Sequence, residues 1–260
     1  GLARGKRHLA IAHGSDVRLL HRLPGGDRLM RHIARRADLV YVADALRVAG
    51  APGRVVPMGL EVAPIIAATD GAARERARRA LGVHGVVVVF LGRLVAVKGV
   101  DLLIEALPAD VTLLVAGDGP ERTALQARAN DRRAIRFLGH VAGAAKLQLL
   151  AAADVLAIPS RDDGAPTVAL EALAAGLPIV ATRAGGLPEL LDERTTRFAA
   201  ATAPALAAAL RELAHDAQLR ARLGSAARAL APTHDWSHVG PALWGDTGAE
   251  VGGCIRVSTV

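Results

Sequence analysis

The sequence predicts an α/β fold built around a doubly wound parallel sheet. Three observations favour this class. From residue 86 onward, short apolar runs alternate with segments of helical pattern. The runs are β-branched and apolar at nearly every position, which is typical of strands covered on both faces. One helical segment follows each run, as strand-helix-strand units require.

The elements of this domain follow from that alternation. Strands are expected at 86–92, 111–117, 134–139, 154–160 and 178–182. Their helices are expected at 99–107, 119–129, 144–153, 166–176 and 187–191. Two further helices, rich in Ala, Leu and Arg, are expected at 202–214 and 216–230. Helices between parallel strands place layers on both sides of one sheet.

The first 60 residues alternate in the same way but supply only about three strands, with one helix over roughly 26–36. Three strands make a poor independent sheet. Residues 57–65 combine turn residues without a clear period, and we interpret them as a linker. The chain is therefore divided into a partial first domain, a nearly complete second domain and a glycine-rich, poorly ordered tail. Their ranges are 1–60, 61–232 and 233–260.

The composition limits the class of partner. The net charge is +7, yet 29 of the 32 basic residues are arginine and aromatic residues are only 2%. Binding to nucleic acid is therefore not expected, because the side chains that stack on bases are nearly absent. The single cysteine, Cys254, excludes an internal disulfide and favours a cytoplasmic protein. Peripheral contact with the inner face of a membrane stays open as an alternative.

Two basic residues follow the first strand of the second domain. In an open parallel sheet, ligands bind outside the carboxyl ends of the strands. Arg93 and Lys98 lie there, just before a helix begins. A guanidinium and an ammonium beside free helix N–H groups suit a diphosphate. Ordinary surface positions are the alternative, but the chain has only three lysines, and one at a strand end favours the functional interpretation.

Gly117 and Gly119 follow the next strand, where they would let the backbone approach a ligand. This signal is weak, because an ordinary turn between a strand and a helix explains it equally well. The segment is not a dinucleotide-binding fingerprint, since Arg122 stands where the third glycine would be.

Two carboxylates lie eight positions apart in the loop and helix that follow residue 160. Asp163 and Glu171 could face the same crevice, and carboxylates accept hydrogen bonds from the hydroxyl groups of a sugar or a ribose. In the alternative, Asp162 or Asp163 only starts the helix and Glu171 lies on a solvated face. The apolar neighbours of Glu171 argue against that alternative, because a bare carboxylate would be costly there.

Taken in order, the segments 92–107, 113–122, 135–141 and 152–191 resemble the carboxyl-terminal domain of the retaining glycosyltransferases of family four. Residues 10–60 resemble the second half of the amino-terminal domain of that family more loosely. The resemblance implies a GT-B fold, in which two Rossmann-like domains face each other across a cleft. Here one domain would be complete and the other partial, as in an amino-terminally truncated member.

The resemblance also implies roles for the residues. Arg93 and Lys98 would hold the donor diphosphate, Asp163 would contact the transferred sugar and Glu171 would bind the nucleotide ribose. His13 would lie near the reacting carbon, unless it is an ordinary histidine at a strand end. The implied catalytic residues are His13, Arg93, Lys98 and Asp163. The implied donor-binding residues are Gly92, Arg93, Lys98, Gly117, Gly119, Asp163, Gly164, Ala165, Pro166, Thr167 and Glu171. No metal and no cofactor are implied.

The expected function is transfer of a sugar from a nucleotide-diphospho-sugar to an acceptor hydroxyl, with retention of configuration. The acceptor would be a glycan, a lipid or a small molecule. Two alternatives stay open: a fragment that only binds nucleotide sugar or a partner protein, and another GT-B enzyme such as a sugar-nucleotide epimerase. The chain departs from the family in having Asp163 where a glutamate is usual. Exposed strand edges of the partial domain would favour association.

Overall fold

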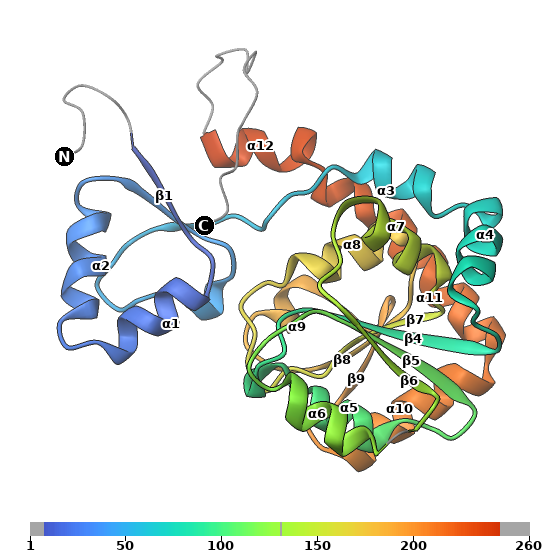
Figure 1. Cartoon of the computed structure of the whole chain (residues 1–260). Helices are drawn as coiled ribbons and strands as arrows, with labels where there is room; N and C mark the ends of the chain where they lie inside the picture. The colour runs from blue at the N-terminus through green and yellow to red at the C-terminus, as the bar shows by residue number, and fades with distance from the viewer. Residues whose placement is uncertain (1–7, 131, 245–260) are drawn as a thin grey trace.

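The structure is a computed structural model that describes residues 8–130 and 132–244. Its described part contains two parallel sheets, one ordered β1-β2-β3 and the other β6-β5-β4-β7-β8-β9. Figure 1 shows the smaller unit, drawn in blue, beside the larger one. The predicted α/β class with parallel sheets is confirmed.

The smaller unit is built on the three-stranded sheet. Its elements are β1 (Leu9–Ala12), α1 (Ser15–Arg22), α2 (Gly26–Ala34), β2 (Asp38–Tyr41), the short 3-10 helix η1 (Asp44–Leu46) and β3 (Arg54–Val55). Parallel pairing sets Leu9 against Asp38 and Val40 against Arg54. The buried Tyr41 hydroxyl donates to the Ala51 carbonyl at 2.9 Å, which ties the chain before β3 to the middle strand. Helix α1 was not predicted, because two turns leave too short a periodic pattern.

The larger unit contains the six-stranded sheet. Its elements are α3 (Val62–Ala68), α4 (Gly71–Leu81), β4 (Val86–Leu91), the 3-10 helix η2 (Ala96–Lys98), α5 (Val100–Ala106), β5 (Val111–Ala116), α6 (Arg122–Ala129), β6 (Ile135–Gly139), α7 (Gly143–Ala152), β7 (Val155–Ile158), α8 (Thr167–Ala175), β8 (Ile179–Thr182), α9 (Leu187–Leu190), β9 (Thr196–Ala199), α10 (Ala203–His215), α11 (Ala217–Leu230) and the 3-10 helix η3 (Ala231–His234). From the centre, β4 to β6 extend the sheet one way and β7 to β9 the other. The order reverses between β4 and β7.

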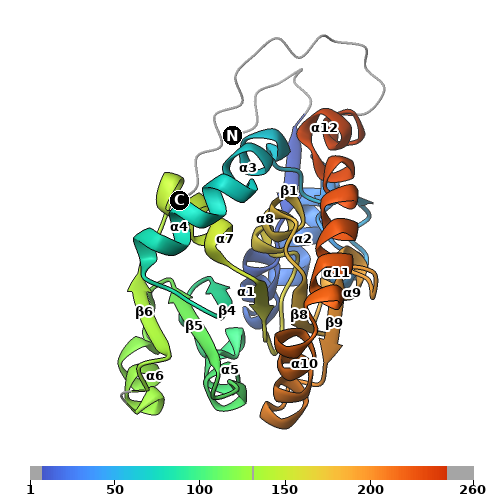
Figure 2. The same cartoon turned by 90° about the vertical axis from the view of Figure 1, so that its right-hand side faces the viewer.

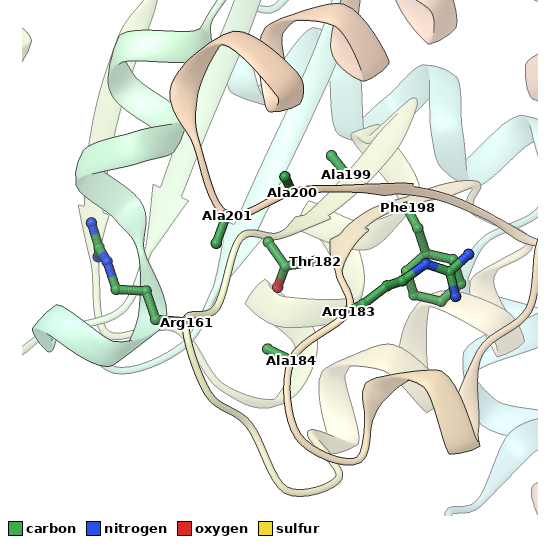
Figure 3. Close-up of a pocket in the computed structure, with 8 residues that line it drawn as sticks. All are labelled: Arg161, Thr182, Arg183, Ala184, Phe198, Ala199, Ala200 and Ala201. Atoms are coloured by element: carbon green, nitrogen blue, oxygen red, sulfur yellow. The ribbon is translucent and has the colours of Figure 1, made fainter.

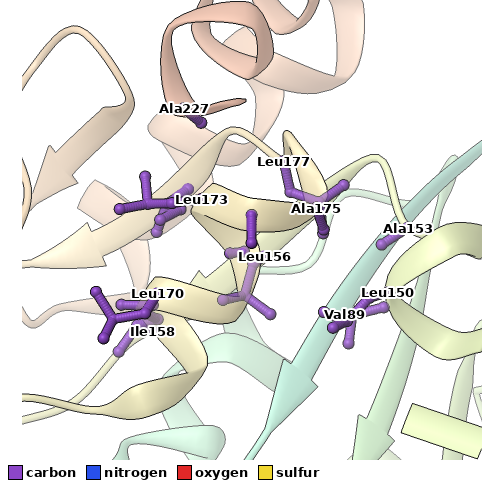
Figure 4. Close-up of a cluster of buried hydrophobic side chains, with 14 of the residues drawn as sticks. Val89, Leu150, Ala153, Leu156, Ile158, Leu170, Leu173, Ala175, Leu177 and Ala227 are labelled. Carbon is purple, nitrogen blue, oxygen red and sulfur yellow. The ribbon is translucent and has the colours of Figure 1, made fainter. Parts of the chain in front are cut away.

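Each face of the large sheet has its own apolar core. Side chains of α3, α7 and α8 pack on one face, and those of α5, α6 and α10 pack on the other. Figure 2 shows the strands between these two groups of helices, and Figure 4 shows part of the first core, including Val89, Leu156 and Leu173. Strands β7 and β8 are buried along their whole length, which explains their unbroken apolar sequences. No helix in the described ranges is both long and apolar enough to cross a membrane.

Three segments of the larger unit differ from the prediction. Helix α3 begins at Val62, inside the predicted linker 57–65, and α4 follows where no helix was predicted. Only Ala77 of α4 is buried, and the face that it shares with Ala73 and Leu81 is narrow and mostly alanine, so the apolar pattern in the sequence is weak. Strand β9 was also missed, because four residues at the edge of the sheet carry little periodic signal.

The predicted poorly ordered tail, 233–260, is wrong for residues 233–244. The first of them end η3 and form the bridge to Leu60, and the rest form α12 (Trp236–Trp244), whose Val239 and Leu243 pack with Val40 and Val56 of the smaller unit. The chain therefore crosses back to the first sheet, as Figure 1 shows. A parallel bridge between Leu60 and Asp235 joins the two crossing segments. The rest of the predicted tail, 245–260, lies outside the described residues.

The Asp154 carboxylate anchors α4 to the large sheet, and its loss is expected to destabilise the fold. It accepts the Val87 N–H at 2.8 Å and an Arg78 N–H at 3.0 Å, and it also pairs with Arg74. Only 11% of this side chain is exposed. Asp154→Asn should lower the free energy of unfolding by about 1–3 kcal/mol, because charge-assisted hydrogen bonds to two arginines are weakened.

Denaturant unfolding would measure this effect. Asp110→Asn is the matched control, because that carboxylate is 62% exposed and pairs with the exposed His215. It should change the free energy by no more than about 0.5 kcal/mol. Equal losses in the two variants would contradict the anchoring role.

Candidate functional site

The candidate site lies where the strand order of the large sheet reverses. The loops that follow β4 and β7 meet there, outside the carboxyl ends of the two central strands. The Arg161 N–H donates to the Val97 carbonyl at 2.7 Å. A Cβ atom at Gly99 would lie 2.0 Å from the Pro159 carbonyl oxygen, so the loops touch through their backbones. Residues far apart in sequence are thereby brought together at the carboxyl edge of the large sheet.

Lys98 and Asp163 form an ion pair across these loops. The Nζ atom of Lys98 lies 2.6 Å from Oδ2 of Asp163, and the Ser160 hydroxyl donates to the same oxygen at 2.9 Å. Only 9% of the Asp163 side chain and 21% of the Lys98 side chain are exposed. Thr182 in turn donates to the Ser160 carbonyl. The structure therefore brings two predicted site residues into direct contact and holds them with two hydroxyls.

A second ion pair fixes the segment that carries Lys98. The Arg161 guanidinium donates to both carboxylate oxygens of Asp101, at 2.8 and 2.6 Å, and to the Ala96 carbonyl at 2.7 Å. The hydrogen bond from Arg161 lowers the pKa of the Asp101 carboxyl, and the same bond raises the pKa of Arg161. Sequence reasoning missed this clamp, because nothing distinguishes Arg161 among 29 arginines.

Arg93 lies on the loop after β4 with its side chain exposed. Among the described residues it makes no side-chain hydrogen bond or ion pair, in contrast to Lys98. Gly92, directly before it, donates its N–H to the Ala116 carbonyl at 3.0 Å, which fixes the start of the loop beside β5. Arg93 therefore presents an uncompensated positive charge at the carboxyl end of β4.

Gly117 and Gly119 serve the packing of two loops. Cβ atoms at these positions would lie 1.8 Å from the Gly92 carbonyl oxygen and 2.4 Å from that of Leu94. Any larger residue would push the loop after β5 away from the loop that carries Arg93. The structure thus gives both glycines a packing reason, and their contact with a ligand stays a prediction.

Glu171 pairs with a lysine that was not among the predicted site residues. Its Oε1 atom lies 2.5 Å from Nζ of Lys146, which belongs to α7. Only 14% of the Glu171 side chain is exposed. The sequence indicated that this carboxylate needs a partner, and the structure shows that the partner is Lys146. Asp163 pairs with Lys98 instead. The rarity of lysine was the signal that could have found Lys146.

The smaller unit contributes His13 and Gly14 to the same region. The His13 carbonyl oxygen would lie 2.9 Å from a Cβ atom at Gly164, and a Cβ atom at Gly14 would lie 3.4 Å from the Gly164 Cα. Ala165 packs against the core of the smaller unit. Pro166 precedes α8 and the exposed Thr167 begins it. The loop 163–166 therefore lies between the two units.

A cavity of about 400 Å³ lies beside this site and contains none of the predicted residues. It opens at the carboxyl ends of β8 and β9 (Figure 3). In it, the Arg183 guanidinium stacks 4.3 Å from the centre of the Phe198 ring. Its lining residues are Arg161, Thr182, Arg183, Ala184, Phe198, Ala199, Ala200 and Ala201. We place the site at the reversal point, because the paired charges gather there. No group of three metal-ligating side chains occurs among the described residues.

Known proteins are similar in sequence to the larger unit. The model of the family described as "Glycosyl transferases group 1" matches residues 73–230. The chain belongs to this family. It is similar to a GDP-mannose-dependent alpha-(1-6)-phosphatidylinositol monomannoside mannosyltransferase of Mycolicibacterium smegmatis, with 34% identity over 252 residues that cover 87% of this chain and 65% of that protein. It is also 35% identical to a D-inositol 3-phosphate glycosyltransferase of Corynebacterium efficiens, over 77% of this chain and 51% of that protein.

The solved structures agree with the family. HepE of Anabaena, in complex with UDP and glucose, superposes with a TM-score of 0.80 at 25% identity, over 92% of this chain and 70% of HepE. WaaG, from lipopolysaccharide biosynthesis, superposes with a TM-score of 0.72. The fold is therefore of GT-B type, as the sequence predicted. The chain spans about half to two thirds of the length of the two relatives named above.

The Lys98–Asp163 pair should contribute to stability as one energetic unit. Lys98→Met and Asp163→Asn should each lower the free energy of unfolding by about 1–3 kcal/mol, since each leaves a mostly buried charge without its partner. The double variant should lose clearly less than the sum of the two. Denaturant unfolding of the unaltered chain, the two single variants and the double variant gives the coupling energy. Strictly additive losses would show that Lys98 and Asp163 do not stabilise the fold as a pair.

Proposed function

We propose that this chain transfers a sugar from a nucleotide-diphospho-sugar to an acceptor hydroxyl with retention of configuration. The observation that carries the proposal is the Lys98–Asp163 pair at the reversal of the strand order. Family membership supports it, as do a relative named GDP-mannose-dependent and a structural neighbour solved with UDP and glucose. Because the chain spans only part of its relatives, the proposal concerns the whole enzyme to which these residues belong.

The donor would bind along the carboxyl edge of the large sheet. Arg93, uncompensated and exposed, would meet the diphosphate first. Lys98 uses one of its three N–H groups on Asp163, so the other two can donate to phosphate oxygens. Oδ2 of Asp163 is occupied by Lys98 and Ser160, which leaves Oδ1 to accept a hydroxyl of the transferred sugar. Glu171, held by Lys146, would accept the ribose hydroxyls.

In the transfer step, the acceptor oxygen would form a bond to the anomeric carbon on the face from which the diphosphate leaves. The bond between that carbon and the phosphate oxygen breaks, and the acceptor proton passes to a departing phosphate oxygen. Arg93 and Lys98 would stabilise the negative charge that develops on the diphosphate. They accelerate the step only as far as they hold the leaving diphosphate more tightly than the intact donor.

The acceptor would be a polyol or a lipid that carries one. Two similar proteins are named for inositol-containing acceptors, one free and one linked to lipid. The acceptor would approach from the smaller unit, where His13 lies next to the loop that carries Gly164. The names of the relatives and neighbours include both GDP and UDP, so both nucleotides belong in any binding test.

Removing either candidate phosphate ligand should weaken nucleoside-diphosphate binding. Arg93→Ala and Lys98→Ala should each cost about 1.5–3 kcal/mol of binding free energy, the size expected for a charge-assisted hydrogen bond. Calorimetry with GDP and with UDP measures this cost. Arg76→Ala, at an exposed position on α4, is the control and should leave the affinity unchanged. Unweakened binding in both site variants would disprove the assignment.

Substitutions of Glu171 and Asp163 should weaken the binding of different ligands. Glu171→Gln should weaken binding of the free nucleoside diphosphate and of the sugar-linked donor alike, because both contain the ribose. Asp163→Asn should weaken only the sugar-linked donor. Each Kd would be compared with that of the unaltered chain, after circular dichroism has established that the variants fold. If both variants lost affinity for the two ligands in the same ratio, the division of roles would be wrong.

A further inference from the structure

We propose that Glu189 is a positioning residue that holds the smaller unit of the chain against the donor loop. Glu189 belongs to α9 of the larger unit, whereas Asp44 and Ala45 begin η1 of the smaller one. Its Oε2 atom accepts the Asp44 N–H at 2.6 Å, and its Oε1 atom accepts the Ala45 N–H at 2.9 Å. One carboxylate thus makes two hydrogen bonds across the boundary between the units.

The chemistry of η1 explains why a carboxylate suits this place. The first N–H groups of any helix have no partner inside it, and they carry partial positive charge. No side chain of η1 or of the residue before it caps these groups. A carboxylate gives each of two neighbouring N–H groups its own oxygen, which fixes both distance and orientation. A glutamine amide at this position has one oxygen and one NH₂ group, so the NH₂ group would face one of the two backbone N–H donors.

The residues around α9 connect this contact to the donor loop. The Gly186 N–H, directly before α9, donates to the Asp163 carbonyl at 2.9 Å. A Cβ atom at Gly186 would lie 2.0 Å from the Gly164 carbonyl oxygen and 2.7 Å from the Cβ of Ala43. The same short segment therefore touches the backbone of the candidate sugar-binding residue and the residue that precedes η1. Movement of η1 away from α9 would separate the units beside Asp163.

This arrangement has a kinetic consequence, which rests on the proposed glycosyl transfer. A transfer step needs the reacting atoms within about 3–3.5 Å of each other. The donor residues Arg93, Lys98 and Glu171 all belong to the larger unit, and His13 belongs to the smaller one. Loss of the Glu189 contact should therefore reduce the fraction of molecules in the productive arrangement and lower kcat, while donor affinity stays the same.

Glu189→Gln tests the proposal, with Glu193→Gln as the matched control. Glu193 lies four residues later, is 66% exposed and pairs with Arg183 of its own unit. Both variants remove one negative charge from the same segment. Spin labels would be attached at Leu29→Cys on α2 and Gln126→Cys on α6, both exposed, in a chain with Cys254→Ser. Double electron-electron resonance then gives the distribution of distances between the units, without any need for activity.

Glu189→Gln should broaden this distribution or shift it to longer distances, and Glu193→Gln should leave it unchanged. An unchanged distribution in Glu189→Gln, or the same change in both variants, would overturn the proposal. In a transfer assay, Glu189→Gln should lower kcat roughly 3- to 10-fold with an unaltered Kd for the nucleoside diphosphate. An equal loss of donor affinity would also overturn it. If the whole enzyme to which these residues belong transfers no sugar, the proposed function fails, and the distance measurement still decides the role of Glu189.

Discussion

Lys98 and Asp163 form a mostly buried ion pair, and the loops after β4 and β7 are organised around it. A charge removed from water is tolerated only when it is paired and hydrogen-bonded. Ser160 supplies the second hydrogen bond to Asp163, Thr182 holds the backbone of Ser160, and the clamp between Arg161 and Asp101 fixes the segment that ends in Lys98. The reversal of strand order makes this possible, because it leaves two loops to meet between β4 and β7.

The loop that carries Asp163 and Gly164 also lies against the smaller unit. Gly164 lies against His13 and Gly14 of the smaller unit, while Gly186 lies against Gly164 and Ala43. These approaches leave no room for a larger side chain at Gly186, and the Glu189 carboxylate adds two hydrogen bonds to η1. Further contacts come from the crossing segments at Leu60 and Asp235 and from α12, which packs on the first sheet.

Arginine and lysine side chains have different kinds of partner in this structure. Several arginines anchor helices, as Arg74 and Arg78 do for α4 and as Arg228 of α11 does through the Thr69 hydroxyl after α3 and the Ala175 carbonyl of α8. Burial without an acidic partner lowers the pKa of Arg228, although it stays protonated at any physiological pH. The two described lysines instead contact the two candidate donor carboxylates. An ammonium keeps further N–H groups for a ligand after it has paired once, which suits a site that must receive phosphate.

The sequence by itself determined the parallel sheet, five of its six strands, the long helices α10 and α11 and the position of Lys98 at a strand end. These features are local, because burial on both faces and helical period are properties of consecutive side chains. Tertiary structure decided the rest. Helix α4 is held by Asp154 as well as by its narrow apolar face, and α12 depends on Val40 and Val56, which are almost two hundred residues away in the chain. The pairing of Glu171 with Lys146 and of Glu189 with η1 joins residues from different elements, and no spacing in a sequence specifies which elements become neighbours.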